Sequence, residues 1–426
     1  MFNQAGLSLD QAPPISVVFK FFFLGALFGI GLGISLFFYQ TSIFDTSTAG
    51  ALSVTHLFTL GVMLSFMFGA LFQMLPVIAG ISITSPSKKS NLLLYPFMFG
   101  VIILILAFNL QYTFLYLLAG TLLAVSLFVI ILPIFKKLRQ VKNHTASSKG
   151  MGIALLSLSL TIIFALYLLL FLSGYVEGTY YTHIKISHYS FGLFGWIALL
   201  IISISFQVIE MFYVTPSYPL FVSKYMPLSL FILLFSSSLL GFYLPHIWIF
   251  TSMLLAFILS AYALLTLQRL KQKKRPLSDA TVWFWRVGLS ALLISMLCMV
   301  LGLFTHLPYV KTFSYIFFAS FALSIVFAMF YKIVPFLTWF HLSSQGYFTA
   351  PMMHEVIHPK TAKNHLYIHI TTIVTYLLSL FVSSFIFLAA LFTILSFSWI
   401  AYQIIHAWKL YKQTQKTGEK FEMNKM

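Results

Sequence analysis

Long apolar runs separated by short polar segments dominate the chain. Most runs contain about 18–25 residues, enough for a helix to cross roughly 30 Å of hydrocarbon. They lie near 15–39, 51–80, 92–110, 112–135, 151–173, 188–211, 226–244, 246–267, 282–304 and 312–340, and a continuous run covers 366–408. The last run is too long for one crossing and is expected to fold back near Ser383 and Ser384, giving spans 366–386 and 387–408. The pattern predicts an all-α membrane bundle of about twelve transmembrane helices.

The composition indicates that the whole chain belongs to the membrane. Hydrophobic residues make up 60% of it and charged residues 8%, and the mean hydropathy is +0.96. These values lie far outside the range of water-soluble domains. The longest polar stretches are 136–150, 268–281 and 341–365, which are too short for an inserted soluble domain. We therefore treat 1–426 as a single integral membrane domain whose function lies among its helices.

Basic residues collect after the even-numbered spans. They are Lys88, Lys89, Lys136, Lys137, Arg139, Lys142, Lys149, Arg269, Lys271, Lys273, Lys274, Arg275, Lys360, Lys363 and the tail from Lys409 to Lys425. By the positive-inside rule, these loops and both termini lie in the cytoplasm of a multi-pass protein of the bacterial inner membrane. Topology and contact with anionic membrane lipid thus account for the net charge of +17, and no nucleic-acid partner is needed. The single cysteine, Cys298, excludes an intrachain disulfide and a CxxC site.

Three spans end in similar short sequences. Spans two, six and ten close with 72–76 (FQMLP), 206–210 (FQVIE) and 331–335 (YKIVP), each an aromatic residue, a long polar residue, two apolar residues and then Pro or Glu. Twelve positions before the polar residue stand the small residues Gly61, Gly195 and Ser320, which allow close helix packing in lipid. Because the three matches are four spans apart, they predict three pseudo-repeats of four helices, with spans two, six and ten facing inward.

Two histidines lie at similar depth near the outer ends of these inner spans. His56 and His188 are expected in the first turns of spans two and six, where two imidazoles from facing helices would suit haem iron or copper. The alternative is an interfacial histidine bonded to a neighbouring carbonyl. His56 lies 17 positions before Gln73 and His188 lies 19 before Gln207, so without a bulge the two are not symmetry equivalents.

Other outer histidines and nearby aromatic residues enter the same hypothesis. His183 and His306 are the next candidates for the partner of His56, and all four histidines are candidate cofactor-binding residues. Phe58, Phe66, Phe68 and Phe72 follow His56 and would wall a porphyrin, although in a chain with 48 Phe such a stripe is more often packing.

Twelve helices in three arcs of four, with a histidine near the outer end of the second, resemble subunit I of the haem-copper oxidases. The nitric-oxide-response haem proteins of the NnrS type are a similar match. In the oxidases, span six supplies a copper-ligating histidine, span seven an adjacent histidine pair and span ten two histidines that hold both haems. Here span six has His188, spans seven and ten have no histidine, and His341 is expected past the inner end of span ten. The resemblance implies a haem-binding protein, with copper as a second candidate, in respiratory or nitric-oxide-related redox or sensing rather than oxygen reduction, with respiratory-chain or electron-donor proteins as partners.

Two other readings remain. Residues 354–358 read HEVIH, the zinc motif of many metalloproteases, but Pro351 and Pro359 bracket them in a loop, which disfavours a shared helical face. A twelve-span transporter of a small neutral or metal-bound substrate is the alternative function. Against it, the chain has only 8 Asp and Glu, nearly all in loops, and Glu210 at the inner end of span six is read as an interface residue.

Overall fold

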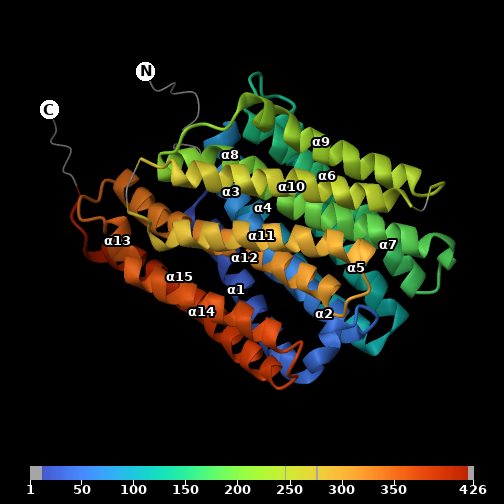
Figure 1. Ribbon diagram of the computed structural model, residues 1–426. Coiled ribbons are helices and arrows are strands. Elements are labelled where there is room, and N and C mark those ends of the chain that lie inside the picture. The colour runs from blue at the N-terminus through green and yellow to red at the C-terminus, as the bar shows by residue number, and fades with distance from the viewer. Residues whose placement is uncertain (1–11, 245, 275–276, 421–426) are drawn as a thin grey trace.

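The computed structural model describes residues 12–244, 246–274 and 277–420, which form helices and connecting loops (Figure 1). The first half contains α1 (Ile15–Tyr39), η2 (Gln40–Phe44), α2 (Ala49–His56), η3 (Leu57–Leu64), α3 (Ser65–Ala79), α4 (Pro86–Leu110), α5 (Thr113–Leu138) and α6 (Ala146–Leu172). Then follow η4 (Gly178–Tyr180), α7 (Tyr181–Ser190), η5 (Phe191–Ala198), α8 (Leu199–Tyr213), α9 (Leu220–Leu240) and α10 (Ile247–Lys271). The last third contains α11 (Ala280–Phe304), α12 (Val310–Ser344), α13 (Met353–Val356), α14 (Pro359–Leu378) and α15 (Phe385–Thr417).

The chain is a polytopic membrane bundle, as its apolar pattern predicts. Within the described residues, 11 helical segments are long and apolar enough to cross a membrane. The expected fold-back lies in the turn between α14 and α15, at 379–384. α14 packs against α15 and makes a twelfth pass, but it is not among the 11, because it begins at Pro359 instead of near 366 and carries lysines and histidines.

Side-chain caps and proline set where several helices begin. Thr48, Thr145 and Asp279 each accept a hydrogen bond from a backbone N–H in the first turn of α2, α6 and α11. Such caps satisfy amides that the helix itself leaves unpaired. Pro86 opens α4, where its missing N–H costs nothing, and Gly80 closes α3 in the left-handed conformation.

The second and sixth passes are the most buried, as expected for inner helices. In their most apolar stretches, 89% of the residues of the second pass (Ala49–Ala79) and 78% of the sixth (Gly178–Tyr213) are buried, against 22–56% elsewhere. The tenth pass, α12, joins them around a central apolar hollow of about 60 Å³. The hollow is lined by Phe66, Leu200 and Val326, among others, from α3, α8 and α12. The three helices that share the short repeated sequence therefore meet inside the bundle.

Two of these helices contain a π-helical segment in the same register. The segments are η3 and η5, and they begin at Leu57 and Phe191. Each begins 16 positions before the repeated glutamine (73 − 57 and 207 − 191), and each contains the predicted small residue, Gly61 or Gly195. π segments are rare and are frequently found at functional sites. The shared register is a structural likeness between the second and sixth passes; α12 is α-helical throughout its described length.

The first and last passes pack together, so the bundle closes on itself. α1 contacts α15 along its length (Figure 1). Because the chain makes twelve passes, Ile15 and Thr417 lie at the same end as Lys89, Lys137 and Lys273. We call this end the basic end and the opposite one, which carries Asp45 and the start of α2, the distal end.

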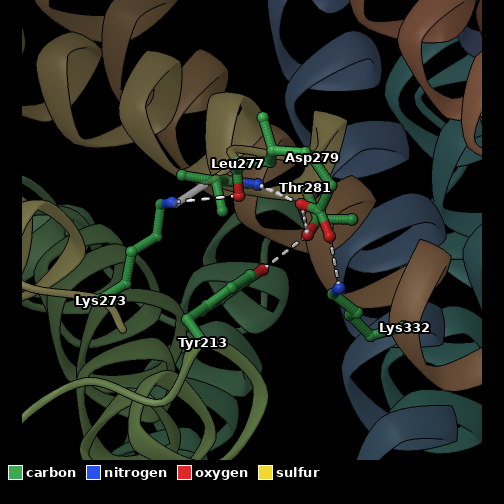
Figure 2. A network of polar contacts seen from close by, with 7 residues as sticks. Tyr213, Lys273, Leu277, Asp279, Thr281 and Lys332 are labelled. Carbon is green, nitrogen blue, oxygen red and sulfur yellow. Dashed lines mark hydrogen bonds and ion pairs between the residues drawn. The ribbon is translucent and has the colours of Figure 1, made fainter. Parts of the chain in front are cut away.

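A polar network ties three helices together at the basic end (Figure 2). The Asp279 carboxylate forms a salt bridge of 2.7 Å with Lys332 of α12 and accepts hydrogen bonds from Val282 N and Thr281 Oγ1. The Tyr213 hydroxyl of α8 donates to Thr281 Oγ1 at 2.9 Å. Burial pushes the pKa of Asp279 up, but the Lys332 ammonium and these hydrogen bonds outweigh it and hold the pKa below its usual value. Lys332 is thus paired within the protein.

Candidate functional site

The structure brings His56 and His188 together near the distal end. Each is the eighth residue of its helix, α2 or α7. Their ring centroids are 6.3 Å apart and their planes differ by 16°. Helices far apart in the sequence thus present two nearly parallel imidazoles to each other.

Backbone carbonyls fix the protonation of both rings. His56 Nδ1 lies 2.8 Å from the Leu52 carbonyl oxygen, and His188 Nδ1 lies 3.1 Å from that of Thr161. A carbonyl only accepts, so Nδ1 carries the proton in each ring and Nε2 keeps its lone pair. Neither Nε2 has a hydrogen-bond partner among the described residues. This arrangement, with Nδ1 held by a carbonyl and Nε2 free, is typical of histidines that bind metals.

The two histidines are not at equivalent positions of their passes. The π segments begin at equivalent positions, so they do not cancel the two-residue offset between His56 and His188. Two residues turn a helix by about 200°. The two rings nevertheless lie side by side in the folded protein.

The aromatic residues that follow His56 mostly pack in the core instead of walling the site. Phe66 contacts Phe22 and Phe330, Phe68 contacts Trp196, and Phe72 stacks on Phe21. The ring beside His56 is instead Phe108 of α4, with centroids 5.0 Å apart. The site is therefore enclosed by residues of α4 and α6, which the apolar stripe of span two does not reveal.

The other two candidate partners lie elsewhere. His183 Nε2 is hydrogen-bonded to the Ser238 carbonyl oxygen at 2.7 Å, and its ring packs against Phe242 and Trp248. His306 is exposed in the loop between α11 and α12. Neither contacts His56. His341, expected beyond span ten, lies on the last turn of α12, which extends to Ser344.

The HEVIH residues cap helices. Glu355 accepts a hydrogen bond from Met352 N, and His358 Nδ1 accepts one from Lys360 N at the start of α14. α13 ends at Val356, so His354 and His358 do not share a helix. Glu210, in turn, accepts a hydrogen bond from Tyr218 N in the loop after α8.

A second buried histidine pair escaped the sequence reasoning. His365 and His369 of α14 are 0% and 2% exposed. Their Nε2 atoms lie 2.8 Å from Ser396 Oγ of α15 and Ser324 Oγ of α12. In the sequence this pair is visible as two histidines one helical turn apart at the start of an apolar run. Ionisable residues inside a membrane span are rare and commonly functional, so this spacing could have identified the pair.

Among the described residues, no group of three or more His, Cys, Asp or Glu could hold a metal ion. Any metal at His56 and His188 would therefore take its remaining ligands from elsewhere.

No family model matches the chain, and no curated protein matches its sequence.

Proposed function

We propose that His56 and His188 are a metal-binding pair that holds haem, in a membrane protein of respiratory or nitric-oxide-related redox or sensing. The observation that supports this most directly is the close approach of two imidazoles whose Nε2 atoms have no hydrogen-bond partner among the described residues. An imidazole nitrogen binds a transition metal at about 2.0–2.1 Å. The ring centroids of His56 and His188 are 6.3 Å apart, so the two side chains are close enough to hold one metal group between them.

Two protein ligands favour haem over a bare tetrahedral ion. A structural zinc site takes four protein ligands and a catalytic one takes three, which the described residues do not bring together. Haem needs few ligands from the protein and histidine is a common one, so His56 and His188 would be sufficient to hold it. Copper held by the two imidazoles is the second candidate for the same pair.

Bound haem would supply reversible one-electron chemistry at the distal end of the bundle. The protein's own contribution would be orientation. The Leu52 and Thr161 carbonyls hold both rings in one tautomer, and Phe108 restricts the His56 ring. Such second partners raise the basicity of the ligand and fix its direction. Electron-donor proteins of the membrane are the partners that this function implies.

The test is the absorption spectrum of protein purified from haem-replete cells. We expect a Soret band that is lost or shifted in both His56→Ala and His188→Ala. His183→Ala and His306→Ala are the matched controls, since they also remove a histidine from the distal end, and they should leave the band unchanged.

A colourless preparation that also contains no copper would overturn the proposal and favour the alternative of a twelve-span transporter of a small neutral or metal-bound substrate. A coloured preparation whose band is unchanged in His56→Ala would retain the cofactor but refute the pair. Copper without haem, lost in both alanine variants, would assign the pair to copper.

A further inference from the structure

Three polar atoms in the basic half of the bundle are buried without a hydrogen-bond partner in the protein. They are His365 Nδ1, the Tyr331 hydroxyl and Trp399 Nε1, from α14, α12 and α15. His365 is 0% and Tyr331 6% exposed. Buried polar groups nearly always have a partner, either in the protein or in an ordered water molecule, so three together require an explanation.

Tyr331 has both other residues as neighbours. The rings of Tyr331 and His365 have centroids 5.7 Å apart, and Trp399 interacts with Tyr331, although the indole N–H and the phenol hydroxyl do not form a hydrogen bond. Ser396, three residues before Trp399 on α15, holds His365 Nε2 at 2.8 Å. This contact anchors the imidazole while its other nitrogen remains unpaired.

The chemistry of the three groups matches water better than an ion. The indole N–H only donates, the phenol both donates and accepts, and a neutral imidazole nitrogen does one or the other according to its tautomer. A cation would face the indole donor, and an anion would meet no fixed positive charge among these three side chains. A buried water typically makes about three hydrogen bonds, to groups otherwise unsatisfied.

We propose that His365, Tyr331 and Trp399 bind an ordered water molecule. The water completes a hydrogen-bonded chain from Ser396 through His365 to Tyr331, across α15, α14 and α12. The site lies in the basic half of the membrane domain. It does not depend on a cofactor at His56.

The test is hydroxyl-radical footprinting of the full-length protein by millisecond X-ray irradiation. Radicals form from water, so a buried side chain beside a bound water is oxidised while a dry one is protected. Tyr218 is the matched control, since it is 4% exposed and its hydroxyl donates to Thr266 Oγ1 within the protein. We expect Tyr331, which is buried to a similar degree, to be oxidised several-fold faster than Tyr218. Equal or slower oxidation of Tyr331 would overturn the proposal, and this comparison needs no variant.

Substitution then identifies the partners of the water. Tyr331→Phe removes one of its three hydrogen bonds and should slow oxidation of Trp399 several-fold, while Tyr218→Phe should leave that rate unchanged. Melting temperatures of both variants would show that they remain folded. Oxidation of Trp399 that is unaffected by Tyr331→Phe in a folded variant would contradict the shared water.

Discussion

At the scale of single residues, Asp279 combines two roles that can be separated. It caps α11 through Val282 N and forms a salt bridge with Lys332. We expect Asp279→Ala to lower the free energy of unfolding by about 1–2 kcal/mol, because a lost cap typically costs about 1 kcal/mol and a partly exposed ion pair adds up to about 1. Asp279→Asn retains a cap acceptor and should cost less. The three proteins are compared by their melting temperatures in detergent. If both variants lost the same stability, the cap and the salt bridge would not be separate contributions.

The same carboxylate predicts a dependence on pH. The pKa of folded Asp279 is lowered, so the group stabilises the fold above its unfolded pKa of about 3.9, and this stabilisation disappears as the pH falls toward the folded pKa. The melting-temperature difference between wild type and Asp279→Asn should therefore be constant near neutral pH and shrink below about pH 4. If the melting-temperature difference between the two proteins grew as the pH fell, the predicted direction of the pH dependence would be wrong.

At the scale of elements, the two π segments are held close to neighbouring helices by glycine. A Cβ at Gly195 would lie 2.8 Å from Ser157 Cβ of α6, and one at Gly61 would lie 2.8 Å from Phe28 Cγ of α1. We expect Gly195→Ala to destabilise the protein by about 1–3 kcal/mol through overpacking. Gly192→Ala, in the same segment, meets only Thr161 Cγ2 at 3.4 Å and should change stability by less than about 0.5 kcal/mol. Equal melting temperatures for the two variants would refute the close approach.

The loop between α12 and α14 gives a second prediction at this scale. Replacing His354 and His358 together by alanine should leave the metal and haem content unchanged, because the pair shares no helix and His358 serves to cap α14. Stability should fall by at most about 1 kcal/mol, the usual worth of a cap. Metal analysis of the purified variant checks this, and loss of tightly bound zinc would revive the metalloprotease reading.

At the scale of the whole molecule, the twelve passes divide the loops between two ends. Reporters fused after Lys142 and Lys273, at the basic end, should report the cytoplasm, and a reporter at Asp45 should report the outer side, because positively charged loops are retained inside. The structure places Lys142 between α5 and α6 and Asp45 between η2 and α2, at opposite ends. An outer location for Lys273 would reverse the orientation of both histidine pairs.

The sequence by itself determined the class of protein and many of its helix positions. The predicted first span, 15–39, coincides with α1, and the expected fold-back near Ser383 lies in the turn before α15. Such features follow from local properties, since the length of an apolar run is matched to the thickness of the bilayer and interruptions fall where polar backbone must meet water.

Only the tertiary structure decided which side chains meet. In the folded protein His188, and not His183 or His306, is the neighbour of His56. Which histidine lies there depends on how two helices far apart in the sequence are rotated against each other. It also paired Lys332 with Asp279 and buried His365 beside Tyr331. The physical reason is that hydropathy records how strongly a segment prefers lipid, whereas the face that it turns inward is set by packing against helices distant in the sequence.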